Sequence, residues 1–119
     1  MSAETTLRFP GLLAHAHETA DYEPFKPGVE ICHLKRAENG AGPGLALLRY
    51  KPGARVPLHE HVGLETICVL AGSQSDEAGT YRAGDVVVNR PGSRHRVWSD
   101  EGCTILISWA EPVRILEDD

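Results

Sequence analysis

Short apolar segments rich in β-branched residues recur along the chain from residue 29 onward, each bounded by stretches that contain glycine or proline. Segments of this length and composition are typical of β-strands. We predict eight strands, at residues 29–34, 45–50, 54–58, 64–70, 79–81, 85–88, 95–98 and 104–109. After residue 28, no stretch repeats its apolar residues at the 3.6-residue period of a helix over three turns.

Eight closely spaced strands without intervening helices favour an antiparallel sandwich or barrel, because parallel strands need long crossover segments. Residues 86–88 and 105–107 are apolar on both faces of their strands, which predicts burial on both sides. Residues 1–23 are more polar and lack this pattern. We therefore predict an N-terminal arm over residues 1–23 and a single all-β domain over residues 24–119, whose outer face is covered by the arm or by a partner.

Composition narrows the possible partners and the compartment. The 119 residues include 12 Lys and Arg against 17 Asp and Glu, a net charge of −5, without the clustered basic surface of nucleic-acid-binding proteins. The sequence has no signal-peptide pattern and no apolar run of membrane-spanning length. The cysteines Cys32, Cys68 and Cys103 are too far apart for a Cys-x-x-Cys site. We expect a cytoplasmic protein that binds neither nucleic acid nor membranes.

Two histidines and a glutamate lie at even spacings after Gly53. His59 and His61 are two residues apart, so on an extended strand they point to the same face, about 7 Å apart along the chain. Glu65 has the same parity, and a turn at Gly63 would return its carboxylate toward the imidazoles. An unpaired buried carboxylate is energetically expensive, whereas two imidazoles and a carboxylate are ligands for first-row metal ions. The pattern predicts a metal site.

His95 is the candidate fourth ligand. On the predicted strand 95–98, alternation places His95, Val97 and Ser99 on one face and the two arginines that flank His95 on the other. Alternation alone does not show with which strand this one pairs. The residues by themselves therefore leave open whether His95 reaches His59 and His61.

The spacing Gly53-x5-His59-x-His61-x3-Glu65-x6-Gly72 resembles the first motif of the cupin superfamily at every position. Gly84, Gly92 and His95 fall at the places of the second cupin motif, from which the chain departs at Arg90, where proline is usual, and at Ser99, where asparagine is usual. Neither departure removes a metal ligand. The resemblance implies a jelly-roll β-barrel that holds a metal ion, often zinc, on three histidines and one glutamate, here His59, His61, His95 and Glu65.

A narrower likeness, over roughly residues 24–109, is to the cupin domain of ChrR-type anti-sigma factors. Residues 72–81, 89–95 and 99–103 carry it. The same subfamily includes free-standing cupins and some diketone-cleaving dioxygenases. Residues 1–23 are too few for the helical, sigma-binding domain of the anti-sigma factors, so an anti-sigma role for this chain acting alone is not expected.

The predicted site suits two functions. The first is a metal-binding cupin with a sensing or small-molecule-binding role; zinc is the expected ion, and iron, manganese or nickel are the alternatives. The second is a metal-dependent dioxygenase that acts on a small diketone or hydroxyketone bound to the ion. The sequence identifies no second catalytic carboxylate near the site, no nucleophile motif and no organic-cofactor motif, so no catalytic residue is assigned.

Other residues carry weaker expectations. His15 and His17 repeat the His-x-His spacing, but they lie in the polar arm, where we expect them to be solvated. His33 is expected at a surface or edge, and Arg49 and Tyr50 are the candidates to face the cavity. Two-sided apolar strands, together with Phe9, Leu12 and Leu13 in the arm, predict self-association, for which a homodimer is the commonest form.

Overall fold

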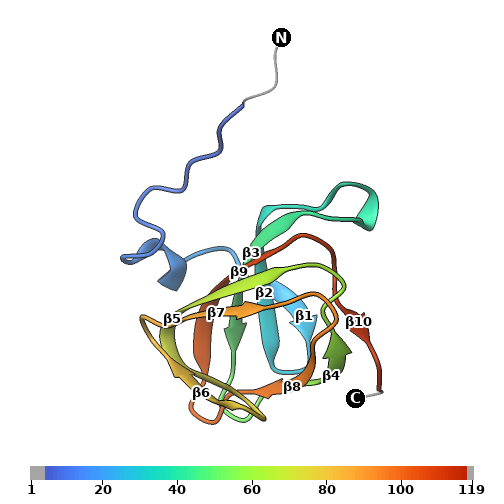
Figure 1. The fold of residues 1–119 in the computed structure, drawn as a ribbon. Coiled ribbons are helices and arrows are strands. Elements are labelled where there is room, and N and C mark those ends of the chain that lie inside the picture. Colours follow the sequence, from blue (N-terminus) through green and yellow to red (C-terminus); the bar gives the residue numbers. More distant parts are fainter. Residues whose placement is uncertain (1–4, 118–119) are drawn as a thin grey trace.

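Ten β-strands form one curled antiparallel sheet in the computed structural model, which describes residues 5–117 (Figure 1). The strands are β1 (Glu23–Lys26), β2 (Val29–Lys35), β3 (Gly44–Tyr50), β4 (Arg55–Glu60), β5 (Glu65–Asp76), β6 (Gly79–Arg82), β7 (Val86–Asn89), β8 (Arg94–Trp98), β9 (Cys103–Trp109) and β10 (Arg114–Ile115). Two 3₁₀ turns, η1 (Ala16–Glu18) and η2 (Glu38–Gly40), are the only helical segments among the described residues. Each predicted strand overlaps one of these strands, which confirms the all-β class.

Two strands, β1 and β10, are additional to the predicted set. They lie at the two ends of the strand order β1-β2-β3-β9-β5-β8-β4-β10, so each pairs with a single neighbour. Pro24 is tolerated in β1 because an edge strand needs its N–H groups on one side only. Such short edge strands carry no alternating pattern, and the sequence therefore does not reveal them.

The longest strand, β5, joins the two sides of the barrel. Its first part pairs with β7 and β9, and its last part pairs with β6 and β8. The strand bends near a register shift between Val69 and Ala71. Gly72 has a φ of +70° there, and a side chain would collide with the carbonyl oxygen of Gly102. Gly72, which follows the predicted strand 64–70, therefore lies within a continuous strand that extends to Asp76.

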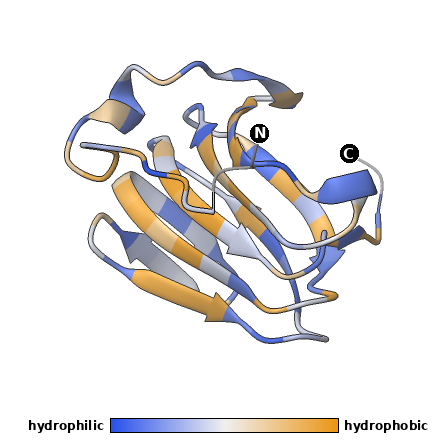
Figure 2. Ribbon diagram, turned by 90° about the horizontal axis from the view of Figure 1, so that it is seen from above, coloured by the Kyte–Doolittle hydropathy of each residue, from blue (hydrophilic) through white to orange (hydrophobic). Residues whose placement is uncertain are grey.

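The inner face of the curled sheet forms the hydrophobic core. Hydrophobic and polar residues alternate along several strands, so each strand presents one apolar side to the interior (Figure 2). Side chains alternate along the first part of β5: Glu65, Ile67 and Val69 are buried and Cys68 is half-buried. The central core side chains are Ile31, Leu48, Ile67, Val69, Val97 and Ile105. Burial raises the pKa of the Cys103 thiol to about 11, so this cysteine stays protonated.

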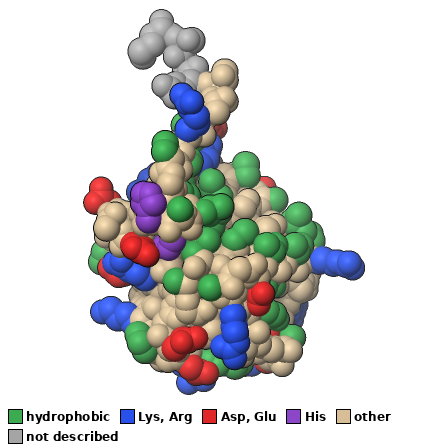
Figure 3. Space-filling view, turned by 90° about the vertical axis from the view of Figure 1, so that its left-hand side faces the viewer, with side chains coloured by type: hydrophobic (Ala, Val, Ile, Leu, Met, Phe, Trp, Pro, Cys, Tyr) green, Lys and Arg blue, Asp and Glu red, His purple; other side chains and the backbone are tan. Residues whose placement is uncertain are grey.

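The outer face is only partly covered. The Tyr22 ring lies 3.9 Å from the guanidinium carbon of Arg49, and Leu12 shares a shallow hollow with Leu45 and Leu106. Hydrophobic side chains gather on this face of the molecule (Figure 3). The rest of the chain leaves the outer face of residues 86–88 uncovered: Val86 and Val88 are 64% and 54% exposed. Among the described residues, no helix is long and apolar enough to cross a membrane.

Candidate metal centre

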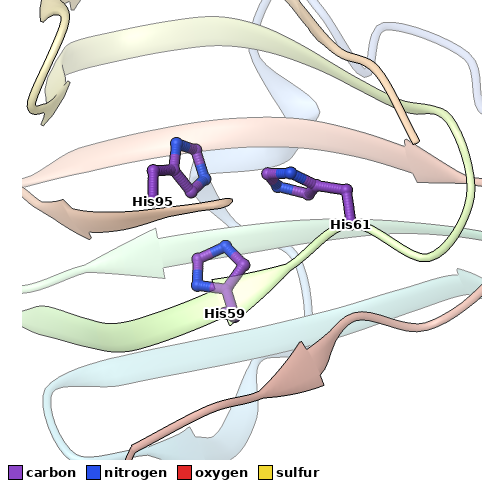
Figure 4. A group of neighbouring side chains, drawn as sticks. All are labelled: His59, His61 and His95. Atoms are coloured by element: carbon purple, nitrogen blue, oxygen red, sulfur yellow. The ribbon is translucent and has the colours of Figure 1, made fainter. Parts of the chain in front are cut away.

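Three of the four predicted ligands come together inside the barrel. His59 on β4 lies directly opposite His95 on β8 in the strand ladder. His61 follows the end of β4, where its backbone N–H donates to the carbonyl oxygen of Ser93. The three rings point toward one another, and each offers a nitrogen within 4.8 Å of the others (Figure 4). The strand register thus supplies the pairing of His95 that the sequence left open.

The Nδ1 atoms of His59 and His61 are engaged away from the centre. His59 Nδ1 lies 2.9 Å from the carbonyl oxygen of Pro57, and His61 Nδ1 lies 2.8 Å from Ser93 Oγ. The Ser93 hydroxyl donates its own hydrogen to the carbonyl oxygen of Arg90, at 2.6 Å, so it accepts from His61. These contacts place the hydrogen of each neutral imidazole on Nδ1 and leave Nε2 as an acceptor.

His95 is held in the same tautomer by a carboxylate. Its Nδ1 lies 2.9 Å from Asp76 Oδ2, and both side chains are buried. The Nε2 atoms of His95 and His61 are buried and have no hydrogen-bond partner in the protein. Three imidazoles with Nδ1 bonded outward and Nε2 free are in the form that binds a metal ion. Burial lowers the pKa of His59, and the nearby histidines lower it further, which favours the neutral form.

Glu65 lies beside this cluster at the start of β5. Its side chain is buried, and its Oε1 is 3.3 Å from His61 Nε2 and accepts a hydrogen bond from Asn89 Nδ2 at 3.0 Å. Ligand atoms about 2.1 Å from one ion, at tetrahedral or octahedral angles, lie about 3.0–3.4 Å apart. The spacing of His61 and Glu65 fits a shared ion.

Gly63 allows Glu65 to approach His61. The chain turns between β4 and β5, as the sequence analysis required, and a side chain at Gly63 would lie within 2.8 Å of the backbone nitrogen of Glu111. The short connection returns the carboxylate toward the imidazole. A larger residue at this position would push the connection away from the segment after β9.

Asp76 is a buried carboxylate beside the cluster that no sequence motif marks. Burial acts to raise its pKa, but hydrogen bonds from His95, the Ala78 N–H and the Tyr81 hydroxyl outweigh that effect, so the pKa is lowered. The sequence feature that indicates the position of Asp76 is its pairing with Gly79, three residues later, which closes the β5–β6 hairpin. The sequence predicts a strand that ends at residue 70, and this places Asp76 outside it.

A cavity of about 310 Å³ adjoins the cluster. His59, His95 and Glu65 form part of its wall, and most of the remaining lining is apolar, including Val56, Ile67, Val97, Ile105, Ile107 and Trp109. Tyr50 also lines the cavity, whereas Arg49 points outward and binds Glu30 at 3.1 Å. Of Arg49 and Tyr50, the residue that faces the cavity is therefore the uncharged Tyr50.

Two histidines differ from their expected surroundings. His33 is half-buried and lines the cavity, and its Nδ1 atom is buried without a hydrogen-bond partner. His17 is only 5% exposed, and its Nδ1 lies 2.7 Å from the carbonyl oxygen of Leu12. The expected solvation of this residue is wrong, because the N-terminal segment folds back on itself around η1. His15 is exposed, as expected.

Comparison with known proteins adds to this geometry. The family model described as the ChrR cupin-like domain matches residues 12–111. The crystal structure of Rhodobacter sphaeroides SigE in complex with the anti-sigma ChrR is similar to this chain, with 26% identity and a TM-score of 0.67. That match covers 77% of this chain and 49% of the other, so this chain spans about half the length of the matched protein. No curated protein matches.

Other solved structures share the fold at lower identity. An RmlC-like cupin protein from Ralstonia eutropha is 23% identical, with a TM-score of 0.73, and the match covers 85% of this chain and 69% of that one. A putative acetylacetone dioxygenase from Methylibium petroleiphilum is 16% identical, with a TM-score of 0.78, and the match covers 100% of this chain and 87% of that one. At these identities the likeness extends to the fold alone.

Proposed function

Because this chain belongs to the ChrR cupin-like family, we propose that it binds one divalent metal ion on His59, His61, Glu65 and His95 and presents that ion to a small molecule. One observation carries the proposal. The Nε2 atom of His61, which carries no hydrogen when Nδ1 donates to Ser93, faces the Glu65 carboxylate at 3.3 Å. Two acceptors at this distance repel each other unless a cation lies between them.

The charge of the site suits a divalent ion. Three neutral imidazoles and one carboxylate leave a net charge of about +1 around such an ion, a small charge to bury beside an apolar cavity. Zinc accepts this set of four ligands in a tetrahedral arrangement, and iron, manganese or nickel would keep further positions for a ligand. We propose zinc as the resident ion, with iron, manganese and nickel as the alternatives.

The cavity supports a ligand that is small and mostly apolar. It lies between the two ends of the strand order, and both β1 and the segment with β10 contribute to its wall through Phe25 and Ile115. Since His59, His95 and Glu65 line the same cavity, an oxygen-bearing group on the ligand would reach the ion while its apolar part packs against Ile105. This arrangement supports a sensing or small-molecule-binding role.

Metal analysis of the purified protein tests the proposal. We expect one metal ion per chain, lost on treatment with a chelator and restored by adding the ion back. A His59→Ala variant that remains folded should contain far less metal. Full occupancy in that variant, or a wild-type protein that takes up no divalent ion, would contradict the proposed site.

A second candidate function is a metal-dependent dioxygenase that acts on a small 1,3-diketone or hydroxyketone. The observation that favours it is the direct contact between the apolar cavity and the candidate ligands, which would place a bound diketone at the ion. A bound iron ion would supply the oxygen chemistry. The protein would contribute the apolar wall that orients the substrate and excludes water. Oxygen uptake by iron-loaded protein, measured with a panel of such ketones, tests this function; no uptake across the panel would contradict it.

We also propose that the chain forms a homodimer in a reducing cytoplasm. The exposed valines Val86 and Val88 on the outer face, together with Leu7 and Leu13 in the N-terminal segment, support self-association. The cysteines are free, in keeping with that compartment. Light scattering should give a mass of two chains, and a truncation that begins at Pro24 would show whether the arm contributes. A monomer at high concentration would contradict the dimer.

A further inference from the structure

The β5–β6 hairpin contacts β8 through two acidic side chains in its turn. Asp76 Oδ2 lies 2.9 Å from His95 Nδ1, and the two carboxylate oxygens of Glu77 each accept from the backbone N–H of Arg96 at 3.1 Å. In the strand ladder, β5 and β8 are paired only at Ser75 and Trp98. The two side chains therefore provide much of the connection between this hairpin and the strand that carries His95.

Asp76 accepts three hydrogen bonds in addition to the one from His95. Its Oδ1 accepts from the Tyr81 hydroxyl at 2.9 Å, from the Ala78 N–H at 2.8 Å and from the Gly79 N–H at 3.2 Å. The residue is 9% exposed. A buried carboxylate with four donors has one orientation, and Oδ2 is left directed at His95.

His95 is the only one of the three clustered histidines whose Nδ1 meets a charged acceptor. His59 donates to a backbone carbonyl group and His61 donates to a hydroxyl group. A carboxylate on Nδ1–H fixes the rotation of the ring and makes Nε2 a stronger electron donor. The effect reaches any ion on Nε2, although Asp76 does not itself face that ion.

We infer that Asp76 is a positioning residue of the metal centre, which aims and strengthens His95 as a ligand, and that Tyr81 holds Asp76 in place. The inference rests on the proposed function, because it concerns an ion bound at His95 Nε2. It enlarges the site from the inner face of the barrel to the turn of the β5–β6 hairpin. The strength of metal binding would then depend on a segment that contributes no ligand.

Cobalt binding to the full-length, metal-free protein tests this role. We would measure the dissociation constant of Co²⁺ by competition with a chelator, and the position and intensity of its visible absorption bands, for the wild type, Asp76→Asn, Asp76→Ala and Tyr81→Phe. The asparagine variant keeps the shape of the side chain and should bind Co²⁺ about 10–100-fold more weakly, with shifted bands. Alanine should weaken binding further, and Tyr81→Phe should weaken it by a few-fold.

Asp85→Asn is the matched control. Asp85 is an exposed turn carboxylate that accepts from the backbone N–H of Arg82 at 2.8 Å, and its neutralisation removes the same charge away from His95. The control should bind Co²⁺ with the affinity and the spectrum of the wild type. A control that weakens binding as much as Asp76→Asn would overturn the inference, because the effect would then be one of overall charge.

The outcomes separate this inference from the proposed function. A wild type that binds no cobalt refutes the metal site, and the inference with it. A wild type that binds cobalt, together with an Asp76→Asn variant of equal affinity and spectrum, leaves the site standing and overturns the role of Asp76. Weaker binding with an unchanged cobalt spectrum also overturns it, because a merely structural residue would act in that way. If the Asp76 variants do not fold, Tyr81→Phe decides, and an unchanged spectrum in that variant overturns the inference.

Discussion

The chain contains two His-x-His pairs with the same spacing and different surroundings. His59 and His61 are both buried, and their rings meet with centroids 5.1 Å apart. His15 and His17 separate: His15 is exposed, whereas His17 is buried and bonded to the carbonyl oxygen of Leu12. Among the described residues, the first pair belongs to the one cluster of possible metal ligands and the second pair to none.

Backbone geometry explains the difference. Along an extended strand, alternate side chains point to the same face, so two histidines that are two positions apart bring their imidazoles to one site. His17 lies in the 3₁₀ turn η1, where successive side chains are about 120° apart and residues two apart point in different directions. The His-x-His spacing therefore indicates a metal site where the chain is extended, as at His59 and His61, and not in a 3₁₀ turn such as η1.

Replacing His61 by Ala should remove most of the bound metal. The change deletes a direct ligand, so the loss should exceed the roughly 10–100-fold that follows removal of an outer hydrogen-bond partner. Adding His95→Ala to the His61→Ala variant should reduce the metal content little further, because the two residues bind one ion. Metal content of the folded single and double variants is the measurement. Additive losses would indicate two separate sites.

Lowering the pH should release the metal, because each of the three imidazoles must lose its proton to bind. Three ligands with the ordinary histidine pKa of about 6.5 would lower the affinity on the order of ten-thousandfold between pH 7 and pH 5. Burial lowers the pKa of His59, so this residue should resist proton competition to a lower pH than free histidine.

The same shift has a consequence for stability. Between the lowered pKa of His59 and the unfolded value of 6.5, the unfolded chain binds more protons than the folded chain. The contribution of His59 to the stability of the metal-free protein is thus present above pH 6.5 and is lost as the pH falls. Chelator competition measures the metal affinity, and urea unfolding measures the stability of the metal-free protein, each at a series of pH values. A metal affinity that is independent of pH would contradict a histidine site.

Replacing Glu65 by Gln should weaken metal binding by at least about 100-fold, the upper end of what the loss of an outer partner costs, because Glu65 is a direct ligand. The amide is neutral, and its NH₂ group can donate to His61 Nε2 and compete with the ion. Isothermal titration with Zn²⁺ measures the change. Asn89→Ala removes only the hydrogen bond to Glu65 and should cost less. Equal effects of the two substitutions would indicate that Glu65 is not a ligand.

Replacing His17 by Ala should leave metal content unchanged and should lower the free energy of unfolding by about 1–3 kcal/mol, because it removes a buried hydrogen bond. The exposed His15→Ala change is the control, with an expected effect within about 0.5 kcal/mol. Metal analysis and urea unfolding of both variants separate the two quantities. Loss of metal in either variant would extend the site into the N-terminal segment.

Much of the fold and three of the candidate ligands could be predicted because they depend on local alternation. The shared face of His59 and His61 follows from the extended chain at the end of β4, and that of His95 and Val97 follows from β8. Glu65 begins the next strand, after the turn at Gly63. The cupin motif then added the expectation that these groups meet. Alternation is a property of the backbone of one segment, so it can be read without knowledge of the partner strand.

Register and bending were decided by the tertiary structure. The pairing of His59 with His95 joins strands 36 positions apart in the chain, and no local pattern encodes that register. Inward-facing residues on β5 have odd numbers up to Val69, but after the register shift Gln74 lines the cavity and Asp76 reaches His95. An inserted residue turns every later side chain of the strand to the opposite face. Whether a strand accommodates the insertion depends on the strands that pair with it. For the same reason Asp76, which has no motif of its own, becomes part of the candidate centre only in the folded chain.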